Sequence, residues 1–164
     1  MLKILDEYLE ESLVVVMMLC MTALIVVQIF MRYVVGASLT WSEELARYFF
    51  IWATYIGVAY GVKKNAHICV EAVTSKLPEK VRVIVYILAQ AIFLVFAIFV
   101  SVEGYILSMK IFSFGQTSSS LGMPMGYIYL APTVGFALVF LRLLQNIWRA
   151  VHELRALKTS GGAA

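Results

Sequence analysis

Residues 83–102 read VIVYILAQAIFLVFAIFVSV, a stretch of 20 residues without a formal charge. Because an α-helix rises about 1.5 Å per residue, this stretch is long enough to cross the roughly 30 Å hydrocarbon core of a bilayer. The chain holds three more uncharged runs, at residues 12–31, 48–62 and 111–141, which are 20, 15 and 31 residues long. Four apolar runs in 164 residues predict an integral membrane protein.

The composition excludes most other classes of protein. Hydrophobic residues make up 62% of the chain and the mean hydropathy is +0.89, whereas soluble domains are about 45–50% apolar. The net charge of +3 is spread over the edges of the apolar runs, so we expect no nucleic-acid partner. The cysteines, Cys20 and Cys69, are not expected to pair, and the spacing of Cys and His offers no metal site. We expect no cofactor.

The apolar runs predict one all-α membrane domain over residues 1–157. Its four transmembrane helices are expected at about 13–31, 41–62, 81–107 and 125–147, and a flexible tail at 158–164. Thr40 stands three residues before Glu43, which is the spacing of a capping box, and Gly36 marks a turn between the first two helices. Residues 66–77 place apolar and polar side chains on opposite helical faces, which predicts a short amphipathic helix at the membrane interface.

The distribution of basic residues predicts the orientation. With four spans, both termini and the 63–82 loop lie on one side of the membrane, and that side carries ten of the 13 Lys and Arg residues. The other three are Arg32, Arg47 and Lys110. Since basic residues collect on the cytoplasmic side, we expect both termini in the cytoplasm. The acidic N-terminus does not match a cleavable signal peptide, so the first helix is expected to be retained.

A charged group at the start of the second expected helix is the sharpest local feature. Glu43 and Arg47 are four residues apart and Glu44 and Arg47 are three apart, and both spacings bring side chains together on a helix. Arg32 and Glu103 are expected on the same side of the membrane. The group could form an ion or proton site, or a salt-bridge network that holds helices or docks a partner. We favour the network, because charges at helix ends can reach water.

Two further patterns are candidates for an interface. Ala53, Gly57 and Gly61 recur every four residues, which lets another helix approach closely, either within the chain or from another protein. His67 and Glu71 are also four apart, and a surface hydrogen bond is favoured there over a metal or proton-relay site. The complete set of structural or partner-interface candidates is Arg32, Trp41, Glu43, Glu44, Arg47, Trp52, Gly57, Gly61, His67, Glu71 and Glu103.

The expected spans lack the chemical groups that catalysis or independent transport would need. None of them carries an ionisable residue near its centre, whereas a proton-coupled carrier usually needs an embedded carboxylate. The two histidines, His67 and His152, lie outside the spans, so they do not offer axial ligands to a haem in the bundle. No nucleophile–base pair or phosphate-binding loop occurs. We therefore expect a membrane scaffold and not an enzyme.

The order of short motifs resembles one transporter family. The stretch WSEELARY at 41–48, followed by Trp52, Gly57 and HICVE at 67–71, resembles the small permease subunit of TRAP transporters, the DctQ type. The segment LGMPM at 121–125, with Pro132 and Arg142 after it, is similar to the last third of the same family. The resemblance covers about residues 5–150.

The resemblance implies a tripartite, sodium-coupled uptake system of the bacterial inner membrane for organic acids such as C4-dicarboxylates or sialic acid. In such a system a periplasmic solute-binding protein captures the substrate, and a large permease subunit carries it with sodium by an elevator-type movement. The small subunit pairs with the large one as a scaffold, with membrane lipid around both. Glu43, Glu44 and Arg47 would then be structural or docking residues near the periplasmic face, and His67 would mark the cytoplasmic interface.

Two alternatives predict different chemistry. A self-contained four-helix exporter of the small multidrug type needs a carboxylate in the middle of its first helix, but here Asp6 to Glu11 precede that helix. Glu103 is the one substitute, and it lies near a helix end. A membrane anchor for a redox or signalling complex would need histidines between the helices if it held a haem.

Overall fold

The computed structural model of the 164-residue chain describes residues 2–64 and 78–160. The described residues form four long helices, which are α1 (Leu2–Phe30), α2 (Thr40–Lys63), α4 (Glu79–Ser113) and α5 (Gly126–Ser160). A π-helical segment, Met31–Val35, continues α1. The structure therefore confirms an all-helical fold for the described part of the chain.

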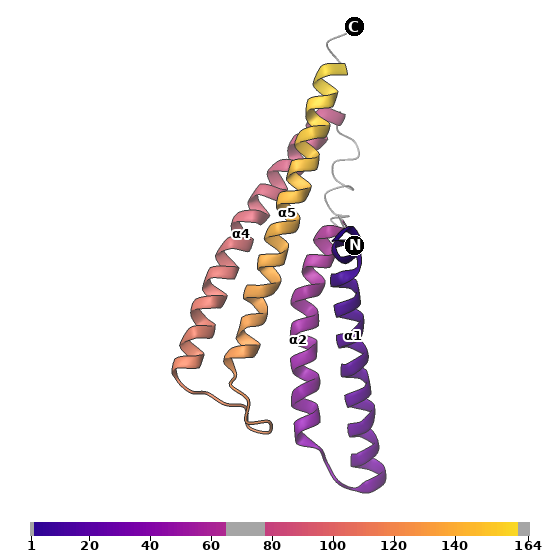
Figure 1. Ribbon diagram of the computed structural model, residues 1–164, viewed down its shortest axis with the longest axis vertical. Coiled ribbons are helices and arrows are strands. Elements are labelled where there is room, and N and C mark those ends of the chain that lie inside the picture. The colour runs from indigo at the N-terminus through magenta and orange to yellow at the C-terminus, as the bar shows by residue number, and fades with distance from the viewer. Residues whose placement is uncertain (1, 65–77, 161–164) are drawn as a thin grey trace.

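The four helices lie side by side in the order α1, α2, α5, α4 (Figure 1). α1 packs against α2, α2 against α5, and α5 against α4, so the described helices form a layer about one helix thick. We call the end of the layer with the 31–39 and 114–125 connections the loop end. The opposite end, where the chain begins and ends, is the terminal end (Figure 1).

The core lies where α2, α4 and α5 meet. Its buried residues are Ala59 and Val62 from α2, Ala97 from α4, and Phe136, Val139 and Leu143 from α5. The Phe136 ring makes edge-to-face contacts with Tyr55 at 6.2 Å and with Phe96 at 5.7 Å between ring centroids. Alanines at two of the core positions allow the helix axes to approach closely, because they carry little bulk between the backbones.

Glycines mark the closest contacts between α5 and its neighbours. A Cβ atom added at Gly126 would lie 2.5 Å from the Phe112 ring of α4. A Cβ atom at Gly135 would lie 2.6 Å from Tyr55 Cβ and 2.8 Å from the Tyr55 carbonyl oxygen in α2. These distances are too short for any side chain, so both glycines are required by packing within the chain.

Among the described residues, three helices are long and apolar enough to cross a membrane, over Leu9–Val35, Val81–Ser113 and Gly126–His152. This finding confirms a multi-pass membrane protein. α2 is 24 residues long, or about 36 Å, but it does not meet the same measure of apolarity, so the fourth span stays a prediction. The predicted amphipathic helix at 66–77 lies outside the described residues.

The helix ends differ from the sequence expectations in several places. α1 begins at Leu2 and not at residue 13, and α5 continues to Ser160, into the expected tail. The prediction that Thr40 caps α2 is wrong, because Leu39 holds the N-cap position and no side chain caps the helix there. The turn at Gly36 is confirmed. Its φ of 75° is left-handed, which favours glycine, and its N–H donates to the Met31 carbonyl oxygen.

Candidate functional site

The charged group at the loop end contains one of its two expected ion pairs. Arg47 Nη2 lies 3.6 Å from Glu43 Oε1, and the two side chains are 66% and 59% exposed. Gln28 Nε2 of α1 donates to Glu43 Oε2 at 3.1 Å. Glu43 therefore joins α1 to α2, and its ion pair with Arg47 is weak because solvent screens exposed charges.

Glu44 was predicted to pair with Arg47, but in the structure its carboxylate has other partners. Its Oε1 atom accepts a hydrogen bond from the Tyr48 hydroxyl one turn along α2. Its Oε2 atom accepts one at 3.0 Å from the backbone N–H of Ser120, in the loop between α4 and α5. Glu44 thus ties this loop to α2, because a fixed amide satisfies the carboxylate.

Two other predicted members of the group are not brought to it. Arg32 is exposed on the π-helical segment, and Glu103 is exposed on α4, at the far edge of the layer from α1. Among the described residues, no three His, Cys, Asp or Glu side chains converge as ligands of a metal ion would. The arrangement is therefore a set of polar ties between elements.

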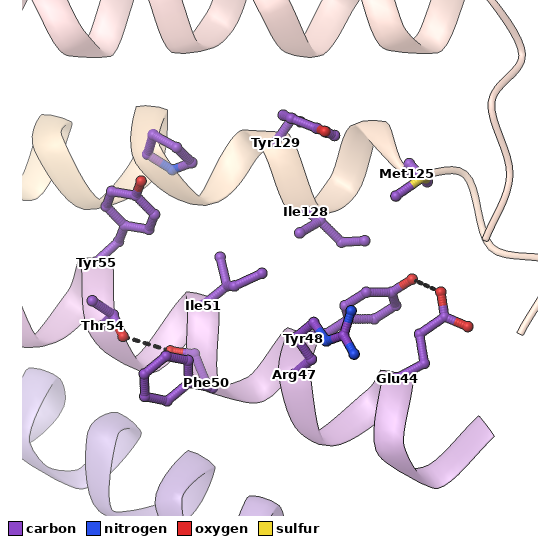
Figure 2. Close-up of a pocket in the computed structure, with 11 residues that line it drawn as sticks. Glu44, Arg47, Tyr48, Phe50, Ile51, Thr54, Tyr55, Met125, Ile128 and Tyr129 are labelled. Carbon is purple, nitrogen blue, oxygen red and sulfur yellow. Dashed lines mark hydrogen bonds between the residues drawn. The ribbon is translucent and has the colours of Figure 1, made fainter. Parts of the chain in front are cut away.

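A groove of about 490 Å³ lies beside this group, between α2 and α5 (Figure 2). Glu44 and Arg47 stand at its polar end, and Ile51 of α2 faces Ile128 of α5 across it (Figure 2). The lining residues are Glu44, Arg47, Tyr48, Phe50, Ile51, Thr54, Tyr55, Met125, Ile128, Tyr129 and Pro132. The groove is amphipathic, with charges at the loop end and apolar and aromatic walls farther toward the terminal end.

The small-residue pattern of α2 does not form a helix contact within the described residues. Ala53 is buried, but a Cβ atom added at Gly57 or Gly61 would meet nothing within 4 Å. Of the remaining interface candidates, Trp41 is exposed and Trp52 is partly buried. The pair His67 and Glu71 lies outside the described residues.

A second polar group, which the sequence did not predict, lies toward the terminal end. Glu10 of α1 is 2% exposed, and its Oε1 atom accepts a hydrogen bond from Arg142 Nε of α5 at 2.8 Å. Lys63 Nζ, at the end of α2, lies 3.7 Å from Glu10 Oε2. Arg142 Nη1 also donates to Gln145 Oε1 at 2.9 Å. We call these four residues, Glu10, Lys63, Arg142 and Gln145, the Glu10 cluster.

The Glu10 cluster brings a buried arginine into an apolar helical stretch, whereas the expected spans carried no ionisable residue near their centres. Arg142 is buried and lies within the apolar helical stretch Gly126–His152. Glu10 belongs to α1, whereas it was expected to precede the first helix. Nearby, Asn146 Nδ2 of α5 donates to the Val62 carbonyl oxygen at 3.0 Å, so a polar contact also joins α5 to the end of α2. The one sequence signal was an arginine that interrupts an apolar run.

These features define the class of protein. The chain is an all-helical, multi-pass membrane protein whose polar groups join neighbouring helices. A family model described as "Tripartite ATP-independent periplasmic transporters, DctQ component" matches residues 21–153. The chain therefore belongs to the DctQ family, as the sequence resemblance predicted, and it is a multi-pass protein of the bacterial inner membrane.

Curated relatives agree with this family. The chain is 32% identical over 161 residues to an isethionate TRAP transporter permease protein, DctMQ, of Oleidesulfovibrio alaskensis. This match covers 94% of this chain and 25% of the DctMQ protein. It is 27% identical over 160 residues to the sialic acid TRAP transporter small permease protein SiaQ of Vibrio cholerae, and the match covers 98% of this chain and 91% of SiaQ. It is 28% identical over 110 residues to a C4-dicarboxylate TRAP transporter small permease protein of Rhodobacter capsulatus, and the match covers 67% of this chain and 48% of that protein.

The extent of these matches differs among the relatives. The chain spans a quarter of the length of the DctMQ protein and about half that of the R. capsulatus protein. Family membership indicates a transport subunit and does not favour the exporter of the small multidrug type. The structure points the same way, because the carboxylate of Glu10 is bound by Arg142 within a polar cluster.

Proposed function

We propose that this chain is the small membrane subunit of a sodium-coupled TRAP transporter for organic acids. In this proposal it pairs with a large elevator-type permease subunit and serves as its scaffold, and a periplasmic solute-binding protein delivers the substrate. The single observation that carries the proposal is the match to the DctMQ permease. There a segment that covers 94% of this chain makes up a quarter of a much longer permease polypeptide.

The architecture suits a scaffold. A transport domain that moves across the membrane must slide against a body that stays in place. A layer of membrane-crossing helices resists tilting and vertical displacement, because both would expose apolar surface to water. Hydrogen bonds join the layer at both ends, from Gln28 to Glu43 and from Arg142 to Glu10, so neighbouring helices are held in register.

The proposal includes a fourth span and an orientation. We propose that α2 crosses the membrane between α1 and α5, because it packs against both and is long enough for a bilayer core. The excess of Lys and Arg on one side then favours cytoplasmic termini, with the loop end on the periplasmic side. A membrane-impermeant thiol reagent should label a cysteine introduced at Ser119 from outside, and it should leave one at Arg149 unlabelled.

Reconstitution in liposomes tests the function. We expect uptake of a labelled organic acid only when this chain, a large permease subunit from the same organism and the matching binding protein are present with an inward sodium gradient. Succinate, sialic acid and isethionate are the substrates to compare, because relatives are named for C4-dicarboxylate, sialic acid and isethionate. Uptake by this chain alone, or full uptake without it, would contradict the scaffold role.

A further inference from the structure

One side of α2 is only partly covered by α1 and α5. Its residues alternate in steps of four and three, which places them on one face of the helix. They are Glu43, Arg47, Phe50, Thr54, Gly57 and Gly61, and each is exposed or partly exposed. We call this face the open stripe. It runs along most of α2, from the charged group at the loop end to the last turns of the helix.

The open stripe and the groove form one concave surface. Arg47, Phe50 and Thr54 belong to the stripe and also line the groove of about 490 Å³ between α2 and α5 (Figure 2). Toward the terminal end, Gly57 and Gly61 continue the open stripe beyond the groove without side chains of their own. The surface therefore has a charged edge, a deep apolar middle and an end of two glycines.

The described residues give no packing reason for the two glycines. At Gly126 and Gly135 any side chain would collide with a neighbouring helix, whereas at Gly57 and Gly61 a Cβ atom would meet nothing within 4 Å. Neither Gly57 nor Gly61 has a positive φ that would favour glycine. Glycine is less favourable than alanine in a helix, so two glycines one turn apart, with no packing reason among the described residues, are what a contact with another protein would require.

Building on the proposed function, we propose that the open stripe and the groove receive one transmembrane helix of the large permease subunit. Apolar side chains of that helix fill the groove, and its backbone passes close to Gly57 and Gly61. Glu43 and Arg47, both more than half exposed, face polar side chains of the partner helix near the membrane edge. Exposed charges of both signs beside an apolar groove suit an amphipathic helix end, whose polar groups would pair with them.

A helix accounts for this surface better than lipid does. A fluid acyl chain adapts to an alanine or leucine as well as to a glycine, so lipid gives no reason for Gly57 and Gly61. A helix backbone approaches closely only where side chains are small, which is the reason for rows of small residues at membrane helix contacts.

Co-purification tests the proposal. The large permease subunit from the same organism carries an affinity tag and is co-expressed with variants of this chain. We expect Gly57→Leu and Gly61→Leu to lower the co-purified amount of this chain by about tenfold or more, because leucine blocks the close contact. Purified alone, both variants should keep the helix content and thermal stability of the wild type, since a Cβ atom at either position meets nothing within 4 Å among the described residues.

A matched control lies on the far edge of the layer. Val95 of α4 is exposed and apolar, so Val95→Trp adds more bulk without touching the open stripe, and we expect it to co-purify normally. A photoreactive amino acid at position 54 should cross-link to the large subunit, and the same group at position 95 should not. If Gly57→Leu and Gly61→Leu assemble normally, or if position 95 alone cross-links, the open stripe is not the interface.

The outcomes separate this inference from the proposed function. If the wild-type chain does not co-purify with the large subunit at all, the proposed function itself fails. If the wild-type and both leucine variants assemble equally, the proposed function stands and the docking surface is wrong. Cross-linking from position 54 only to phospholipid would also overturn the inference, since it would identify the groove as a lipid site.

Discussion

Replacing Glu10 should destabilise the chain more than any change in the exposed charges at the loop end. Glu10→Ala removes a hydrogen bond between charged groups at 2.8 Å and leaves Arg142 and Lys63 together without the carboxylate between them. Breaking a buried ion pair on one side typically costs about 3–5 kcal/mol. Arg142 keeps its hydrogen bond to Gln145, and the Lys63 side chain is 17% exposed. We therefore expect a loss of about 3 kcal/mol in the free energy of unfolding.

A double-mutant cycle isolates the interaction between Glu10 and Arg142. We expect Glu10→Met and Arg142→Met each to destabilise the chain, because each removes the 2.8 Å hydrogen bond between the two side chains and leaves the remaining charge buried with weaker partners. The double variant should be more stable than the sum of the single losses predicts, by about 2 kcal/mol, because the hydrogen bond between the two side chains is already lost in either single variant and cannot be lost twice.

The measurement is reversible unfolding of the purified chain in mixed micelles of a mild detergent and sodium dodecyl sulfate, followed by circular dichroism. The exposed pair of Glu43 and Arg47 is the matched control, since it is also a Glu–Arg pair but lies in solvent. A loss below about 1 kcal/mol for Glu10→Ala, equal to that of an exposed pair, would refute the reasoning. Independent effects of Glu10→Met and Arg142→Met would refute it as well.

Three other substitutions can be compared in the same titration. Arg47→Ala should cost at most about 1 kcal/mol, because the pair with Glu43 is exposed. Gly135→Ala should cost about 1–3 kcal/mol, because its Cβ atom would lie 2.6 Å from Tyr55 Cβ and 2.8 Å from the Tyr55 carbonyl oxygen. Gly61→Ala should raise the stability of the isolated chain by about 0.5–1 kcal/mol, because its Cβ atom meets nothing and alanine favours the helix.

Each of these expected changes in stability can be contradicted by a specific result. A loss of several kcal/mol for Arg47→Ala would mean that the pair is buried in solution. An unchanged Gly135→Ala variant would mean that α2 and α5 are farther apart than in the structure, and a destabilised Gly61→Ala variant would mean that the site is already occupied in the isolated chain.

The two polar groups of the chain act on different parts of the layer. At the loop end, Glu44 holds the connection between α4 and α5 against α2. Toward the terminal end, the pair of Glu10 and Arg142 links α1 to α5 across the end of α2. Both ties join segments far apart in sequence, so they hold the two helical hairpins, α1–α2 and α4–α5, as one body.

The sequence alone determined where the chain forms helices and that it enters a membrane. In hydrocarbon every backbone polar group needs an internal partner, so uncharged runs such as 83–102 have little choice other than a helix. The pair of Glu43 and Arg47 was predictable for a similar reason, since residues four apart always meet on a helix. The ordered motifs from Trp41 to Arg142 also indicated the family.

Only the tertiary structure decided which charges are buried and which glycines pack against a neighbouring helix. Glu10 and Arg142 are 132 positions apart, and Glu44 and the Ser120 amide are 76 apart, so no local spacing predicts either contact. Gly57 and Gly135 are equally small in the sequence, yet one faces open space and the other touches Tyr55. Such differences depend on how far apart neighbouring helices lie and how each is rotated, because packing between helices fixes both and helical periodicity does not.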